Sequence, residues 1–270
     1  MIATKELPLI QYGKFKLHLN DLADFFFHIY RNQGASEAKL VSVTGLGANK
    51  VENFRYYLRD LGLLIPGKYT PTPLGELVYE YDPRFIEEFT QWVLLYNWSK
   101  RTGNPVLHFF LNEVASEVNL DGLETLFLYW AKSNNYKSDY QDDTIKGLVK
   151  RTKEALTDND AFSGLNVIRE VEPRLLRGEP YNVHPLLVAY ILYDNRSTQQ
   201  HSIAIDHLLQ EHGNIGKFFG YDTRMLENKL GELVNLDIIK RVQVANLNMI
   251  EFKEADNALA FVEKYYVEYT

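Results

Sequence analysis

The chain has no cysteine among its 270 residues. This absence excludes disulfide bonds, thiolate zinc sites, iron–sulfur clusters and a cysteine nucleophile. No apolar run approaches the ~18 residues that a transmembrane helix needs, and the N-terminal stretch MIATKELPLIQYGKFK lacks the basic and apolar regions of a signal peptide. We therefore expect a cytoplasmic protein that does not enter a membrane.

Basic residues are also outnumbered by acidic ones, and the net charge is −7. A protein that coats nucleic acid gains affinity from clustered Lys and Arg, which release counterions from phosphates. Residues 39–68 do hold such a cluster, with five basic side chains against two acidic ones, whereas residues 251–268 hold five acidic against two basic. The charge is thus polarised along the chain, and the first of these regions is the one suited to nucleic acid.

Recognisable catalytic motifs are sparse. No serine lies in a G-x-S-x-G motif, and the three histidines between 201 and 212 do not have the i, i+4 spacing of a helical metal site. Asp139, Asp142 and Asp143 could hold Mg²⁺, although carboxylates at the start of a helix commonly favour the helix dipole instead. We expect no metal or cofactor, with Mg²⁺ required only if the protein is a nuclease.

The most informative stretch is VTGLGANKVENFRYYLRDLGLL, residues 43–64. Two glycines form a turn, and the following residues Val51, Phe54, Leu58 and Leu61 make one apolar helical stripe. A phosphate-binding loop is disfavoured, since the P-loop and Rossmann patterns are incomplete and the preceding segment looks helical. LLIPGKYTPTPLG then predicts a small β-hairpin. Helix, turn, helix and hairpin follow each other in the winged-helix order.

The same order recurs near the C-terminus. Residues 202–211 predict a helix, GNIGKFFG a connecting turn, and Asp222 an N-cap for a helix over 223–236. Two strands are expected on either side of residues 246–248. The predicted fold is mainly α with small β-hairpins as wings: two winged-helix units, in residues 1–81 and 161–270, joined by a helical middle region, 82–160, with a boundary at TDNDAFSG.

A recognition helix over 48–61 would turn polar side chains outward opposite its apolar stripe. The candidate nucleic-acid-binding residues are Asn49, Lys50, Asn53, Arg55, Tyr56, Arg59 and Lys68, with Lys217 and Arg224 in the second unit. Asn suits adenine and Lys suits guanine, while Arg suits phosphates. The alternative is a solvated face on which Glu52 pairs with Arg55 or Arg59 and nothing is bound.

The motifs GLGANKVENFRYYLRDLGLL, TPTPLGELVYEYDP, FTQWVLLYNWS, HFFLNE and GNIGKFFGYDTRMLENKLGELVNL resemble the domain-of-unknown-function 4007 (DUF4007) family over roughly residues 40–255. The resemblance implies a link to prokaryotic DNA phosphorothioation and related defence gene clusters, near sulfur-transferring enzymes, and similarity to DNA-nicking components. The family pattern carries over to Gly45, Gly47, Asn49, Lys50, Arg55, Tyr56, Lys217 and Phe218.

Two features depart from that pattern. The family usually opens with His-Glu-Thr-Phe, whereas His18 is not followed by Glu-Thr-Phe here, and ANK stands where GKN is usual. The expected function is duplex-DNA binding as an accessory or nicking component of a modification or defence system. DNA-modification enzymes are possible partners and a homodimer is plausible. The alternatives are a protein-interaction adaptor or transcriptional regulator without catalysis, and a metal-dependent nuclease.

Overall fold

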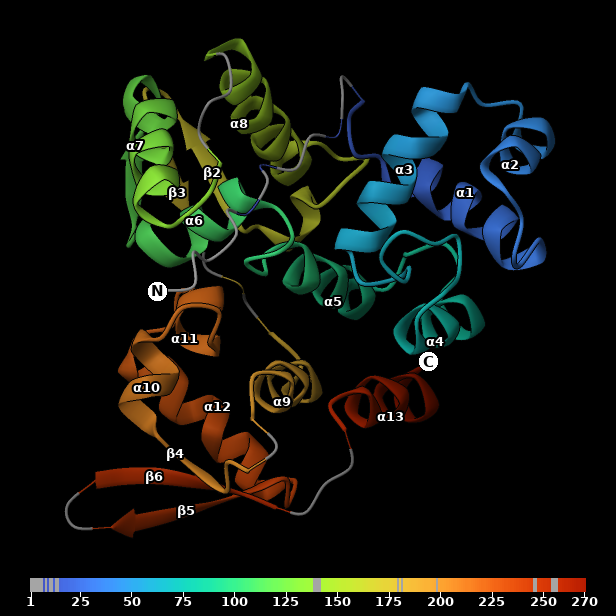
Figure 1. The fold of residues 1–270 in the computed structure, drawn as a ribbon. Helices are drawn as coiled ribbons and strands as arrows, with labels where there is room; N and C mark the ends of the chain where they lie inside the picture. The colour runs from blue at the N-terminus through green and yellow to red at the C-terminus, as the bar shows by residue number, and fades with distance from the viewer. Residues whose placement is uncertain are drawn as a thin grey trace, which may run out of the picture. The chain divides into compact units, whose positions relative to one another are not determined.

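The computed structural model describes residues 7, 9, 12, 15–137, 142–178, 180, 182–197, 199–244, 247–253 and 257–270 (Figure 1). The chain divides into two compact units, Met1–Gly178 and Glu179–Thr270. The segment 157–164, which the sequence suggested as a boundary, lies inside the first unit: Phe162 is fully buried with its ring centroid 6.1 Å from that of Trp98.

The first unit begins with a group of helices. They are α1 (Leu19–Arg31), α2 (Glu37–Thr44), α3 (Ala48–Asp60), α4 (Pro73–Tyr81) and α5 (Glu88–Trp98). Ser36 caps α2 by accepting a hydrogen bond from the Lys39 amide, and Gly45 ends that helix with φ 70°, a left-handed conformation that glycine adopts without strain. The helical segment before the glycines, the turn and the helix after it are therefore present as predicted. The N-cap of α1 is His18, without a capping hydrogen bond from its side chain.

The hairpin after α3 is minimal. Leu64 and Pro71 form an isolated antiparallel bridge, and the Ile65 amide donates to the Thr70 carbonyl over 2.9 Å. The turn at its tip includes Gly67, with φ 76°, next to the exposed Lys68. The chain then enters α4 through Thr72, whose hydroxyl accepts from the Gly75 amide. The loop is thus short and held at both ends.

The rest of the first unit is not purely helical, which corrects the prediction for the middle region. It contains α6 (Pro105–Glu113), β1 (Glu117–Asn119), α7 (Leu120–Ser133), α8 (Asp142–Thr157), the 3-10 helix η1 (Ser163–Leu165), β2 (Ile168–Val171) and β3 (Arg174–Arg177). The strands form an antiparallel sheet in the order β1-β3-β2. β1 has three residues, and Glu117 pairs with Leu176 far along the chain, so no local pattern reveals it.

The second unit consists of α9 (Pro185–Asp194), β4 (Ser202–Ala204), α10 (Ile205–Gln210), α11 (Ile215–Phe219), α12 (Thr223–Asn235), β5 (Ile239–Val244), β6 (Leu247–Phe252) and α13 (Leu259–Tyr269). Its sheet order is β4-β6-β5, and β5 and β6 form the long ribbon in Figure 1. Asp222 caps α12 as predicted, by accepting from the Met225 amide. The helix predicted over 202–211 is wrong at its start, because residues 202–204 pair with β6.

Two segments share one order of elements. We call residues 105–177 the middle module and residues 185–252 the C-terminal module. Each runs from a helix to a short strand, then through further helices to a two-stranded hairpin, and in each sheet the last strand lies between the other two. Each first helix begins with proline, at Pro105 and Pro185, which is favourable there because the first helical amides have no partner within the helix.

The apolar stripe predicted for residues 48–61 does form part of the core, since Val51, Leu58 and Leu61 are fully buried. Leu22, Phe26 and Ile29 of α1 are fully buried, as are Leu226 and Leu230 of α12. No helix within the described ranges is both long enough and apolar enough to span a bilayer. The mainly helical class with small antiparallel hairpins is confirmed.

Candidate nucleic-acid interface

Helix α3 is fixed to the first unit by one apolar face. Val51 and Leu58 are fully buried, and the ring of Phe54 meets that of Phe25 edge to face with centroids 5.6 Å apart. The helix buries these side chains against α1 and α2, with which it is in contact. Its orientation follows from this packing, and so does the set of side chains left outside.

The two asparagines of α3 have different positions. Asn49 is exposed in the first turn, whereas Asn53 is 9% exposed. The Asn53 side-chain amide donates to the Asn49 backbone carbonyl over 2.6 Å. The expectation that Asn53 faces outward is therefore wrong, because its short polar side chain finds an acceptor one turn back along the helix.

Lys50 and Arg55 each lie on an aromatic ring beside a carboxylate. The Lys50 ammonium lies 5.0 Å from the Phe54 ring centroid and 3.2 Å from a carboxylate oxygen of Asp21. The Arg55 guanidinium lies 5.3 Å from the Tyr69 ring centroid and 3.9 Å from Glu52. Both side chains remain partly exposed, at 32% and 20%. A phosphate would have to compete with these partners for the two cations.

Tyr56 belongs to the same outer face. Its hydroxyl donates to a Glu52 carboxylate oxygen over 2.7 Å, and this hydrogen bond raises the pKa of Tyr56. The guanidinium of Arg55 lies 5.2 Å from its ring centroid, and that of Arg59 lies 5.1 Å away. Both guanidinium groups thus contact the same tyrosine ring.

Arg59 is anchored by a buried carboxylate. Its Nε lies 2.6 Å from Asp60, whose other oxygen accepts from the Tyr12 hydroxyl over 2.7 Å. Tyr12 in turn accepts from the Trp98 indole over 2.9 Å and stacks on Tyr57, with ring centroids 4.0 Å apart. Burial raises the pKa of Asp60, and the bonds from Arg59 and Tyr12 oppose that rise. Sequence reasoning missed this network, because Tyr12 and Trp98 have no local signal that joins them to α3.

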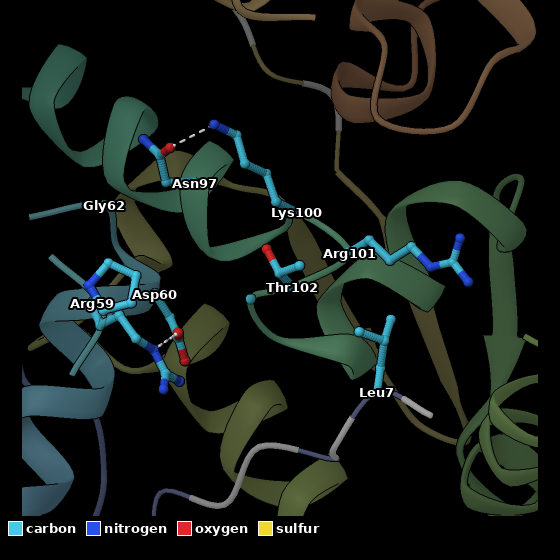
Figure 2. Close-up of a pocket in the computed structure, with 10 residues that line it drawn as sticks. Leu7, Arg59, Asp60, Gly62, Asn97, Lys100, Arg101 and Thr102 are labelled. Atoms are coloured by element: carbon cyan, nitrogen blue, oxygen red, sulfur yellow. Dashed lines mark hydrogen bonds and ion pairs between the residues drawn. The ribbon is translucent and has the colours of Figure 1, made fainter. Parts of the chain in front are cut away.

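A cavity of about 380 Å³ adjoins the end of α3. It is lined by Leu7, Arg59, Asp60, Gly62, Pro66, Asn97, Lys100, Arg101, Thr102 and Gly103. Figure 2 shows the Arg59–Asp60 pair on one side and Thr102 on the other, with the Lys100 ammonium directed to Asn97. The consecutive cations of the loop after α5 were the sequence signal that could have indicated this cavity.

The candidate residues of the second unit lie on α11 and α12. Lys217 is half-buried on α11 and its neighbour Phe218 is buried, whereas Arg224 is exposed in the first turn of α12. Further along α12, Lys229 lies 2.9 Å from Glu232. Helix α12 thus carries the exposed Arg224 in its first turn and the Lys229–Glu232 ion pair further along.

The carboxylates proposed for Mg²⁺ are only partly described. Residue 139 and the side chain of residue 142 lie outside the described residues, and Asp143 is exposed. Among the residues that the structure does describe, no three His, Cys, Asp or Glu side chains come together in a way that could hold a metal ion.

Comparisons with known proteins place the fold. Among solved structures, the chain is similar to one described as "Magnesium ion-bound SspB crystal structure", with a TM-score of 0.78 and 15% identity over 95% of this chain and 87% of that one. It is also similar to "SspB crystal structure", with a TM-score of 0.76 and 16% identity over 97% and 89% of the two chains. No curated protein matches its sequence significantly. The sequence matches the family described as "Protein of unknown function (DUF4007)" over residues 26–266, and the chain therefore belongs to the DUF4007 family.

Proposed function

We propose that this chain is a DNA-binding accessory component of a prokaryotic DNA phosphorothioation system or a related defence system. Membership of the DUF4007 family, whose motifs imply a link to phosphorothioation and defence gene clusters, and a fold shared with the two SspB structures support this role. At 15% identity the two proteins share a fold, but most of their residues differ. The DNA-binding part of the proposal therefore rests on this chain's own surface.

The proposed DNA-binding element is a winged helix formed by α1, α2, α3 and the hairpin around Lys68. In such a unit the last helix enters the major groove and the hairpin contacts the adjacent backbone. The middle and C-terminal modules have the matching order, with a short strand after their first helix. We assign all three segments to winged-helix units, one more than the sequence predicted.

One observation carries the proposal: Asn49 is exposed at the start of α3, Lys50 and Arg55 are partly exposed on that helix, and Lys68 is exposed on the hairpin that follows it. Asn49 is placed to contact a base edge, since it is exposed in the first turn. Lys50, Arg55 and Lys68 would contact phosphates, Arg59 would support them through Tyr56, and Asn53 would fix the helix start. Lys217 and Arg224 would add a weaker contact in the second unit.

A salt series tests this directly. Duplex binding is measured by fluorescence anisotropy for the unaltered chain and for Lys50→Gln combined with Lys68→Gln, on plain and on sulfur-modified DNA. Each lost phosphate contact lowers the slope of log affinity against log salt by about 0.9. We expect the double variant to lose about two units of slope.

The matched control is Lys132→Gln combined with Lys264→Gln, which removes the same charge from α7 and α13. If the unaltered chain does not bind duplex at low salt, or if the control pair changes the slope as much as the α3 pair, the DNA-binding proposal is wrong. Preference for sulfur-modified duplex would favour a role in phosphorothioation over another defence system.

Nicking is the finer part of the proposal. It is supported by the family resemblance, and one similar structure is described as magnesium-bound. Asp139, Asp142 and Asp143 remain the candidate ligands, and no catalytic step follows from the residues described. Incubation of supercoiled plasmid with the protein and Mg²⁺ or Mn²⁺ tests it: an intact plasmid would remove nicking and leave DNA binding standing.

A second candidate function is a protein-interaction adaptor, and a groove in the middle module favours it. This groove of about 570 Å³ lies between α7, α8 and the hairpin β2-β3. It is lined by five acidic side chains and two lysines, with Leu120, Leu123, Val149 and Pro173 as apolar walls. Such a surface repels phosphates. Co-purification of a DNA-modification enzyme after nuclease treatment, unaffected by Lys50→Gln, would favour the adaptor.

A further inference from the structure

The cavity at the end of α3 has the size of a small-molecule site. Its volume of about 380 Å³ falls in the range of roughly 300–1,000 Å³ that is usual for ligand pockets. Its walls come from α3, the hairpin, the end of α5 and the loop between α5 and α6. All of these belong to the first unit, so the cavity is formed within one compact body.

The charge of this cavity is positive in a protein whose net charge is negative. Three cationic side chains, Arg59, Lys100 and Arg101, line it together with a single carboxylate, Asp60. Both oxygens of that carboxylate are already occupied, one by Arg59 and one by Tyr12. The ion pair with Arg59 balances its charge, so the net positive charge of the lining comes from Lys100 and Arg101.

The cations contribute in different ways. Arg59 lines the cavity with a side chain 26% exposed, and its pairing with Asp60 fixes the direction of the guanidinium. The Lys100 ammonium donates to the Asn97 side chain over 2.8 Å, and an ammonium carries three N–H donors. Arg101 donates to the Asn134 carbonyl and points away from Arg59 in Figure 2. Its charge therefore acts on the cavity mainly through its electrostatic field.

The remaining walls are apolar and close-packed. Leu7, Gly62 and Pro66 face the cavity beside the exposed hydroxyl-bearing Thr102. A Cβ added to Gly103 would lie 2.5 Å from the Trp98 carbonyl oxygen, so the loop can follow this path only with glycine at that position. Apolar walls with a few fixed polar groups are typical of sites for organic ligands rather than for a bare ion.

We propose that this cavity is a nucleotide-binding site, in which Lys100 binds the phosphate and the apolar walls take the sugar and base, with the Arg59–Asp60 pair on another side of the cavity. The inference deepens the proposed function, on which it rests, by placing a terminal nucleotide of a bound strand at the end of α3. A free mononucleotide presents the same chemistry. The experiment below separates these two sources.

Calorimetry with the full chain compares inorganic phosphate, deoxyadenosine, deoxyadenosine 5′-monophosphate, and hairpin duplexes whose 5′ end carries either a phosphate or a hydroxyl. We expect the monophosphate to bind more tightly than the nucleoside, and the affinity to fall with salt. Lys100→Gln should weaken monophosphate binding about tenfold, because it removes a charge-assisted hydrogen bond. Arg101→Gln should weaken it less, and Lys132→Gln should leave it unchanged.

Arg59→Gln is not used alone, because it would leave Asp60 buried without its cation. Equal binding of nucleoside and monophosphate, no binding of either, or an unchanged affinity in Lys100→Gln would overturn the inference. A preference for the phosphorylated duplex end that Lys100→Gln abolishes identifies the DNA strand as the source, and binding of the mononucleotide alone identifies a free ligand. Duplex binding that depends on Lys50 and Lys68 but ignores the end phosphate leaves the proposed function standing and removes only this site.

Discussion

Helices α3 and α12 occupy the same place in the order of elements, before a hairpin, yet they use charge differently. On α3, Lys50, Arg55 and Arg59 lie on aromatic rings, and the last is fixed by a buried carboxylate. On α12, Arg224 is exposed, and Lys229 forms a partly buried pair with Glu232, whose own side chain is 43% exposed. The difference shows that equivalent positions in a fold do not imply equivalent roles for their charges.

The largest contrast should come from removing one carboxylate on each helix. Asp60→Ala leaves Arg59 without its partner and Tyr12 without its acceptor, and it should lower the free energy of unfolding by about 3–5 kcal/mol. Glu232→Ala breaks a partly exposed pair and should cost about 1 kcal/mol or less. Urea unfolding followed by circular dichroism measures both. Equal losses would contradict the distinction between a buried and a surface charge.

The apolar faces, in contrast, should behave alike. Leu58 of α3 and Leu230 of α12 are both fully buried, so Leu58→Ala and Leu230→Ala should each cost about 2–5 kcal/mol. The chain's three tryptophans, Trp92, Trp98 and Trp130, all lie in the first unit. Tryptophan fluorescence should therefore report the first change. Hydrogen exchange along α12 should report the second, and a shift of the tryptophan transition in Leu230→Ala would show that the units unfold together.

The helix caps of the two units should respond differently to pH. His184 Nδ1 accepts the Leu186 amide at the start of α9, where α6 uses the side chain of Asn104. Burial, with Lys229 nearby, lowers the pKa of His184 below its usual 6.5. Because the folded pKa is the lower one, this stability is present above pH 6.5 and is lost as the pH falls toward the folded pKa.

Protonation removes a cap worth about 1 kcal/mol, so amides of α9 should exchange faster at pH 5.5 than at pH 7.5 after correction for the intrinsic rate. His184→Asn keeps a capping acceptor that does not titrate, and it should abolish the difference. An unchanged pH dependence in that variant would assign the effect to another group.

The smallest effect concerns DNA. Arg224→Gln should reduce the salt slope of duplex binding by at most about one unit, the value of a single phosphate contact. Lys50→Gln combined with Lys68→Gln serves as the comparison on the same duplex. A larger loss from Arg224→Gln than from the double variant would make α12 the main contact and reverse the assignment of the two helices.

Local signals predicted much of the helical framework. Asp222 caps α12 where the sequence placed it, because an N-cap depends only on residues within one turn. The β1-β3-β2 sheet escaped prediction since Glu117 and Leu176 are brought together by the helices between them. The start of α10 was misread for the same reason, because residues 202–204 pair with β6.

The candidate site shows the same limit. The sequence placed Lys50, Arg55 and Lys68 at or near the surface of one helix and one hairpin, because the apolar stripe of α3 fixes which face is buried. It did not show that Asn53 turns back to the Asn49 carbonyl, or that Tyr12 and Trp98 converge on Asp60. These contacts depend on the direction of side chains and on segments distant in the chain.

By itself, the sequence determined the helical class, the hairpins after α3 and α12 and the family, because these follow from periodicity, turn residues and short motifs. The tertiary structure decided which charged side chains are fixed by their neighbours, where the β1-β3-β2 sheet forms and where a positive cavity opens beside α3. The physical reason is that the burial and pairing of a side chain depend on the groups packed against it, and only the folded chain brings those groups together.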